Sequence, residues 1–174
     1  AMAFCHAEGF AHRDLKPKNI MVDAATDSIK IADLGLGRFV DRMNTVMKMS
    51  QKSVGGTPAY LCPEARVEND AQREIGAKRD VYALGVIVVE MVRHVRGGPA
   101  ADHAGRTPQT REALGLLQAE GTDTAGLMGR VVENCMKGLP GLRPSMDEIA
   151  NEMRATREAA EREAVEREAV VREA

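Results

Sequence analysis

A short run near the start of the chain, AHRDLKPKNIM at residues 11–21, gathers side chains that can manage protons and negative charge. It contains the carboxyl group of Asp14, the ammonium group of Lys16 and the amide of Asn19. A carboxylate can accept a proton from a hydroxyl group, and hard oxygen ligands are those that Mg²⁺ prefers. A lysine supplies a compact positive charge. These residue types suit a reaction at a negatively charged group.

Three motifs follow one another in a fixed order. HRDLKPKN at residues 12–19 fits the pattern H-R-D-L-x-x-x-N at every fixed position. IADLG then supplies the tripeptide Asp-Leu-Gly at residues 33–35, and GTPAYLCPE at residues 56–64 ends in Cys-Pro-Glu. Any one of these could occur by chance, but all three in this order could hardly do so.

The sequence therefore resembles the large, C-terminal lobe of a eukaryotic-type protein kinase, from Ala3 to about Ala155. That family has Asp-Phe-Gly and Ala-Pro-Glu where this chain has Asp-Leu-Gly and Cys-Pro-Glu. DVYALG at residues 80–85 is similar to the start of the family's buried central helix, and LRPS at residues 142–145 to its arginine–proline element. The segments DVYALGVIVVEM and RPSMDEI are most similar in sequence to those of tyrosine-kinase-like serine/threonine kinases.

The resemblance implies a catalytic set, with ATP and Mg²⁺ as cofactors and a protein serine or threonine as substrate. Asp14 is expected to accept or orient the proton of the substrate hydroxyl, and Lys16 to reach the γ-phosphate. Asn19 and Asp33 are expected to bind Mg²⁺. Met21 is expected to lie under the adenine ring, although a core position for it stays open, because the two look alike in sequence.

The resemblance also implies structural roles for four residues. His12 is expected to act in packing and not as a base, and Asp80 to hold the backbone of the catalytic loop. Glu64 and Arg143 are expected to form a buried ion pair. Removing one partner of such a pair costs several kcal/mol, so either mutation would resemble a loss of function without touching the chemistry.

Residues 34–56 become the activation loop under this interpretation. Arg13 is the kind of arginine that binds a phosphate on this loop through two hydrogen bonds. Thr57 matches the family's substrate-facing threonine near Asp14. The candidate phosphorylation sites in the loop are Thr45, Ser50 and Ser53.

The sequence predicts a mainly α-helical fold with one small β-hairpin. AMAFCHAEG reads as the last turns of a helix closed by Gly9, and the apolar run VYALGVIVV as a helix buried on all sides. Strands are predicted at residues 19–23 and 28–33, an irregular stretch at 34–56, helices near 78–95, 109–120, 125–137 and 145–174, and a connector at 97–108.

We expect two regions: a partial kinase domain at residues 1–150 and a charged helical tail at residues 151–174. The tail repeats EREAV every five residues, which keeps no single apolar face on a helix. It offers favourable i,i+4 pairs between Glu158 and Arg162, Glu163 and Arg167, and Glu168 and Arg172. A solvated single helix is favoured over a dimerising coiled coil because no heptad seam is visible.

Composition limits the classes of function. The chain has 174 residues, 44% of them apolar, which suits one globular domain. The net charge of the chain is −2, and residues 152–174, with seven Glu and five Arg, account for all of it. The charges of the other residues therefore balance, and no basic face points to nucleic acid as a partner. Three widely spaced cysteines favour reduced thiols and an intracellular, cytoplasmic protein. No signal peptide or membrane segment is visible.

Other parts that a kinase needs are missing from the sequence. It contains no Gly-rich loop over the phosphates, no third-strand lysine and no partner glutamate. We therefore expect a small lobe or upstream domain in a longer parent protein, and little or no activity from this chain alone. The alternative is a non-catalytic kinase-like lobe that binds protein partners through its helical face and charged tail.

Overall fold

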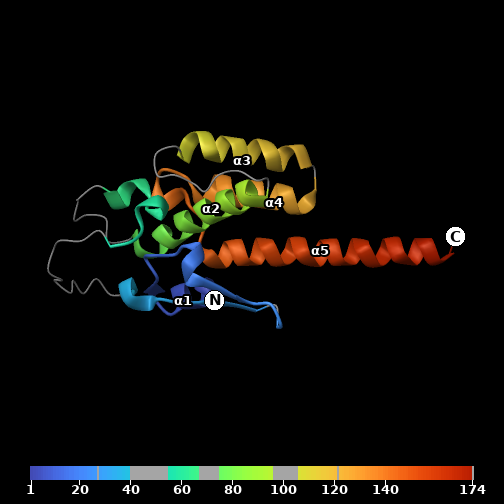
Figure 1. Ribbon diagram of the computed structural model, residues 1–174. Helices are drawn as coiled ribbons and strands as arrows, with labels where there is room; N and C mark the ends of the chain where they lie inside the picture. Colours follow the sequence, from blue (N-terminus) through green and yellow to red (C-terminus); the bar gives the residue numbers. More distant parts are fainter. Residues whose placement is uncertain (27, 40–54, 67–74, 96–105, 121, 174) are drawn as a thin grey trace.

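The computed structural model describes residues 1–26, 28–39, 55–66, 75–95, 106–120 and 122–173. Helices make up most of this described part, and α2 lies at its centre (Figure 1). Helices α3 and α4 pack along one side of α2, and the N-terminal elements lie on its other side. The helices are α1 (Met2–Ala7), α2 (Ile75–Val95), α3 (Arg106–Glu120), α4 (Asp123–Cys135) and α5 (Met146–Glu173).

The predicted hairpin is present. Strand β2 (Ile20–Asp23) pairs antiparallel with β3 (Ser28–Ile31), with Ile20 opposite Ile31. The second strand ends two residues earlier than the predicted 28–33. The reason is Asp33, whose backbone takes left-handed values of φ 60° and ψ 66° that no strand allows.

A second sheet was not predicted. Strand β1 (Phe10–Ala11) pairs antiparallel with β4 (Arg38–Phe39), and a 3₁₀ turn occupies Leu34–Leu36. The expected irregular stretch at 34–56 was therefore wrong for its first residues, and residues 40–54 lie outside the described part. Strands of two residues are too short to show an alternating pattern in sequence.

The predicted helices are all present, with shifted ends. Helix α2 begins at Ile75 instead of residue 78, and α3 at Arg106, so the predicted connector 97–108 is too long by three residues. Pro108 falls within the predicted connector, but it sits in the first turn of α3, where its missing N–H has no partner to lose.

Local capping sets the start of the last two helices. The side chain of Thr122 accepts a hydrogen bond from the Ala125 N–H at 3.1 Å, which starts α4 two residues before the predicted 125. Ser145 and Glu148 form a reciprocal capping box at the start of α5. Helix α5 then runs without interruption past residue 150, so a division between domain and tail at that point stays a prediction.

The N-terminal helix ends as the glycine predicts. Helix α1 stops at Ala7, and Gly9 takes a φ of 76° while its N–H donates to the His6 carbonyl at 3.0 Å. A left-handed glycine just past a helix satisfies otherwise unpaired carbonyl groups. The turn directs the chain into β1 and the loop that follows it.

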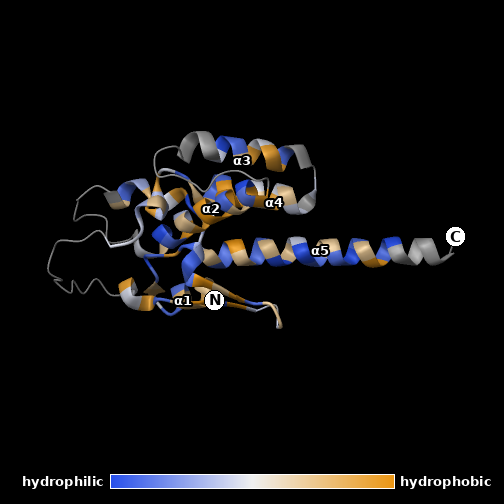
Figure 2. Ribbon diagram, viewed as in Figure 1, coloured by the Kyte–Doolittle hydropathy of each residue, from blue (hydrophilic) through white to orange (hydrophobic). Residues whose placement is uncertain are grey.

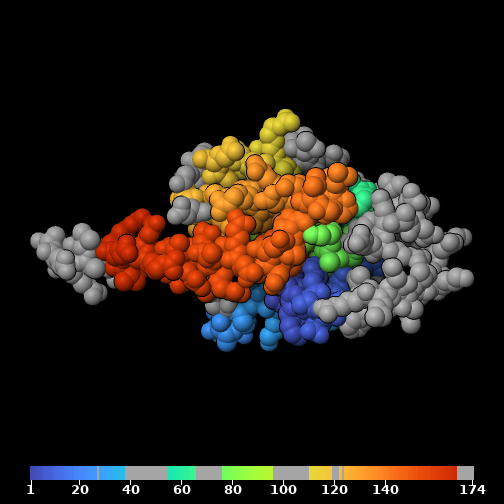
Figure 3. All heavy atoms as spheres, turned by 180° about the vertical axis from the view of Figure 1, so that it is seen from behind, coloured from blue at the N-terminus to red at the C-terminus, as the bar shows by residue number. Residues whose placement is uncertain are grey.

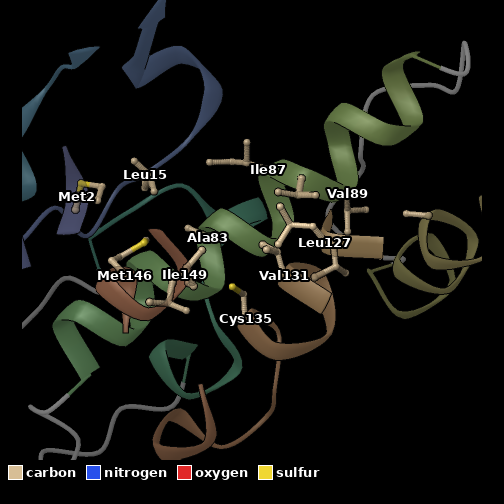
Figure 4. Packing of buried hydrophobic residues seen from close by; sticks show 14 residues of the cluster. Met2, Leu15, Ala83, Ile87, Val89, Leu127, Val131, Cys135, Met146 and Ile149 are labelled. Carbon is tan, nitrogen blue, oxygen red and sulfur yellow. The ribbon is translucent and has the colours of Figure 1, made fainter. Parts of the chain in front are cut away.

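The core is built around α2. Its apolar run is buried on all sides as predicted: Val81, Tyr82, Ala83 and every residue from Val86 to Val89 are at most 6% exposed. Figure 2 shows apolar residues gathered on α2, and Figure 4 shows its side chains meeting those of α4 and the start of α5. Gly85 lets α4 approach closely, because a Cβ there would lie 2.6 Å from Met136 Cγ.

Helix α5 projects beyond the rest of the molecule (Figures 1 and 3). Its 28 residues span about 42 Å. The predicted pair of Glu163 and Arg167 is present at 3.2 Å, and a further pair joins Arg157 to Glu161 at 3.4 Å. The side chains of Glu168 and Arg172 lie outside the described part. Among the described residues, none of the helices combines the length and apolarity needed to cross a membrane.

Candidate active site

The backbone of the loop after β1 is fixed by one buried carboxylate. Asp80 on α2 is 1% exposed and accepts hydrogen bonds from the N–H groups of His12 at 2.8 Å and Arg13 at 2.7 Å. His6 Nε2 on α1 lies 2.9 Å from the same carboxylate. The loop thus takes its shape from α2, which lies more than sixty residues away in sequence. The predicted contact between Asp80 and the loop backbone is present.

His12 is fully buried, and both nitrogen atoms of its ring form hydrogen bonds. Nδ1 accepts the Asp14 N–H at 3.3 Å, so Nε2 carries the proton and donates it to the Ala32 carbonyl at 2.9 Å. These bonds join the loop to the residue before Asp33. With both nitrogens held by backbone groups, the imidazole is not placed to transfer a proton.

Asp14 lies in a compact cluster with Lys16 and Thr57. Its Oδ1 accepts the Thr57 N–H at 2.7 Å and the Thr57 hydroxyl at 2.8 Å. Its Oδ2 accepts from Lys16 Nζ at 2.6 Å, and Lys16 also donates to the Thr57 hydroxyl oxygen at 2.9 Å. These three residues, predicted from two separate motifs, are brought together by the fold.

This cluster keeps the Asp14 carboxylate charged. Burial by itself would raise the pKa of Asp14, but the hydrogen bonds from Lys16 and Thr57 outweigh burial and hold its pKa below the usual value. A charged carboxylate can orient a hydroxyl group and accept its proton.

Asn19 follows Asp14 in the same loop and is 5% exposed. Its amide Nδ2 donates to the Asp14 carbonyl at 2.9 Å, which fixes the amide and directs its donor side away from solvent. Asp33 lies at the end of the hairpin, exposed, with a left-handed backbone. Both residues retain oxygen atoms that are suitable ligands for a hard cation.

The described residues of the site form no cage of acidic side chains. Within the described ranges, no group of three or more His, Cys, Asp or Glu side chains could hold a metal ion. Mg²⁺ instead takes one or two protein oxygens and completes its shell with water and phosphate. The donor set of Asn19 and Asp33 therefore fits Mg²⁺ bound together with a nucleotide.

Met21 lies on β2 and is 59% exposed, so the core alternative for this residue was wrong. Its neighbour Val22 is 65% exposed and Ile29 across the hairpin 61%. Because successive strand residues point to opposite faces, both faces of the hairpin present apolar side chains.

Glu64 and Arg143 form the predicted buried ion pair. The guanidinium of Arg143 makes two parallel bonds to the carboxylate, at 2.5 and 2.9 Å, and lies 5.0 Å from the centre of the Tyr82 ring. Burial opposes ionisation of both partners, yet their mutual contact lowers the pKa of Glu64 and raises that of Arg143. The other guanidinium N–H groups donate to the carbonyls of Lys78, Lys137 and Gly138.

The predicted regulatory residues are only partly described. The candidate phosphorylation sites Thr45, Ser50 and Ser53 lie outside the described residues. Arg13 is described, and its backbone takes an unusual φ of 69°, held by Asp80.

Some residues of the site were not identified from sequence. His6 and Arg79 both reach the site from helices, and the Tyr60 hydroxyl donates to Glu90 at 2.6 Å. Burial, followed by the contact with Glu90, raises the pKa of Tyr60. No short motif contains these pairs, since each joins residues at least 24 positions apart.

The family model for the protein kinase domain matches residues 1–153. The chain is 34% identical over 151 residues to mitogen-activated protein kinase kinase kinase 1 of Arabidopsis thaliana, covering 86% of this chain and 23% of that protein. It is 39% identical over 93 residues to serine/threonine-protein kinase PknB of Mycobacterium tuberculosis, covering 53% and 14%.

The chain thus matches under a quarter of the length of these relatives. The family match nevertheless extends from the N-terminal helix through the cluster of Asp14, Lys16 and Thr57 to the first turns of α5. By this match the chain belongs to the protein kinase domain family, and serine/threonine kinases are among its relatives.

Proposed function

We propose that this chain forms the large lobe of an ATP-dependent serine/threonine protein kinase, of the tyrosine-kinase-like type. The observation that carries this proposal is the cluster of Asp14, Lys16 and Thr57, which joins two distant motifs through short hydrogen bonds. A carboxylate kept charged beside a lysine suits the transfer of a phosphoryl group to a hydroxyl.

The roles follow from the positions of these groups. Asp14 orients the substrate hydroxyl and accepts its proton. Lys16 shares its charge between Asp14 and the phosphoryl oxygens as negative charge moves toward the acceptor. Thr57 faces the substrate and holds the carboxylate in place.

ATP and Mg²⁺ are the proposed cofactors. Asn19 and Asp33 would hold the metal ion, which when bound neutralises charge on the phosphate oxygens. Met21 would contact the adenine from below, and its exposure on β2 supports this assignment. Asn19 is already fixed by its bond to the Asp14 carbonyl, so little ordering is needed there.

A small lobe in a longer parent protein completes the proposal. The hairpin supports it, because Met21, Val22 and Ile29 expose apolar surface on both faces of a two-stranded sheet. Phosphorylation of Thr45, Ser50 or Ser53, read by Arg13, is the proposed regulation. Three free cysteines fit an intracellular, cytoplasmic location.

Nucleotide binding by the 174-residue chain tests the proposal. Calorimetry with ATP and Mg²⁺ should show weak binding that depends on the metal ion and is lost in Asp33→Ala. Asp23→Ala on the same hairpin is a matched control and should bind like the unmodified chain. ATP binding that depends neither on Mg²⁺ nor on Asp33 would favour the alternative of a non-catalytic binding module. If the chain binds no nucleotide, the same titration with a small lobe added in trans should restore binding, and failure there would reject the proposal.

A further inference from the structure

Arg79 is a buried cation beside the catalytic cluster. It lies near the start of α2, is 8% exposed, and shares a small pocket with Arg13, Asp14 and Thr57. Its Nη2 donates to the Gly55 carbonyl at 2.6 Å. Its Nε is buried and, within the described residues, has no hydrogen-bond partner. Burying a charged group with an unmet donor costs free energy, so stability alone does not explain this arginine.

The segment that Arg79 holds leads directly to Thr57. Gly56 has a φ of 125°, a backbone angle that residues with a side chain rarely adopt. A Cβ on Gly56 would lie 3.0 Å from the Arg13 carbonyl oxygen and 3.3 Å from Arg79 Nη2. The glycine backbone is thus enclosed between the catalytic loop and the guanidinium. The next N–H along the chain is that of Thr57, which donates to Asp14 at 2.7 Å.

Two consecutive residues of α2 therefore hold the two halves of the site. Asp80 accepts from the backbone of the catalytic loop at His12 and Arg13. Arg79, one position earlier, donates to the backbone of the opposite segment at Gly55. Consecutive residues of a helix are separated by a fixed rise of about 1.5 Å. The catalytic loop and the Gly55 segment are therefore held at fixed positions relative to each other by adjacent residues of α2.

We propose that Arg79 is a positioning residue for the catalytic carboxylate, which acts by holding the Gly55 carbonyl so that Thr57 donates both its N–H and its hydroxyl to Asp14. This inference rests on the proposed role of Asp14 in phosphoryl transfer. It also makes a statement about the chain that needs no nucleotide, so it can be tested separately from that role.

Amide exchange by NMR in the full 174-residue chain measures the effect. In Arg79→Gln, exchange at the Thr57 N–H should rise about tenfold relative to the Val88 N–H in the core of α2, as expected for losing one hydrogen bond from a charged donor. Arg79→Lys, which keeps a charged donor, should retain most of the protection.

Arg93→Gln is the matched control. Arg93 lies on the same helix, is also 8% exposed, and has one bonded nitrogen, to Glu112, and one buried nitrogen without a partner in the described part. It lies fourteen residues, or about 21 Å, along the helix from Arg79. If Arg79 were only a stabilising residue, both variants would raise exchange at Thr57 and Val88 in parallel.

Unchanged exchange at the Thr57 N–H in folded Arg79→Gln would overturn the proposal, because the variant lacks the donor that holds the Gly55 carbonyl.

The unmodified chain supplies a test that does not depend on any variant folding. The Nη hydrogens of Arg79 should exchange and rotate slowly, as in a guanidinium bound to a buried carbonyl. Fast rotation at Arg79 would reject the proposal even if Arg79→Gln failed to fold. A positive result, together with no nucleotide binding even when a small lobe is added in trans, would leave the positioning contact intact and reject only the catalytic function.

Discussion

Asp80 holds Arg13 in a left-handed backbone conformation, with φ at 69° and a hydrogen bond of 2.7 Å from the Arg13 N–H to Oδ1. Such a conformation costs a non-glycine residue on the order of 1–3 kcal/mol. The cost is offset by a fully buried carboxylate that also accepts from His12 and lies against His6. The strained residue directly precedes Asp14, so this bond sets the direction of the chain as it enters Asp14.

The first prediction concerns that carboxylate. Asp80→Asn replaces one acceptor oxygen by an NH₂ group that faces another donor. The free energy of unfolding should therefore fall by about 2–4 kcal/mol. Urea denaturation followed by circular dichroism measures the change. Glu133→Gln, the same exchange at an exposed position on α4, should stay within about 0.5 kcal/mol of the unmodified chain. Equal effects of the two substitutions would contradict the role assigned to Asp80.

Two glycines should respond to substitution by alanine with opposite changes in stability. Gly56→Ala should destabilise the chain by about 2 kcal/mol or more, because φ is 125° and the new Cβ would crowd the Arg13 carbonyl. Gly129→Ala in α4 meets no atom within 4 Å and should stabilise by up to about 1 kcal/mol. Thermal unfolding of both variants checks the opposite signs.

The ion pair of Glu64 and Arg143 should show in the pH dependence of stability. The pKa of Glu64 lies below its usual 4.5 in the folded chain, so the unfolded chain binds more protons in the acid range. The contribution of this residue is therefore complete above the unfolded pKa and is lost as the pH falls through the folded pKa.

Glu64→Gln should lower the free energy of unfolding by about 3–5 kcal/mol near neutral pH, since Arg143 stays buried without its partner. The variant should also lose part of the acid dependence between about pH 5 and pH 3. The rest comes from other carboxyl groups with a lowered pKa, among them Asp14, Asp23 and Glu148. Urea titrations across this range test both statements. An unchanged acid slope in Glu64→Gln would show that other carboxylates control it.

The cysteines should differ in reactivity. Cys62 and Cys135 are fully buried, and burial raises their pKa values to about 11 and about 12. Cys5 is partly exposed. Since the thiolate is the reactive form, iodoacetamide at about pH 8 should label Cys5 first and the other two only after unfolding. Peptide mass spectrometry at short times measures the order, and early labelling of Cys62 would refute the burial argument.

Much of the fold could be predicted because its signals are local. The apolar run of α2, the glycine after α1 and the two strand-like runs of the hairpin each lie within one short stretch of sequence. The ion pair of Glu64 and Arg143 was predicted only through the family resemblance, since 79 positions separate its members.

What sequence missed depends on contacts between distant segments or on very short elements. Arg79 belongs to none of the motifs found in the sequence, and its partner is a backbone carbonyl, which no residue type reveals. The pairing of β1 with β4 involves two residues on each strand, too few for a pattern. Ends of helices shifted by two or three residues where a proline or a capping threonine decided the first turn.

The C-terminal part of α5 protrudes from the domain and can act as a lever arm. A rigid helix of about 42 Å converts a tilt of roughly 10° at its base into a displacement of about 7 Å at its tip. The base of that lever packs against α1 and α4, and α1 also carries His6 beside Asp80. A small change of angle where α5 leaves the domain would therefore displace its tip by a much larger distance.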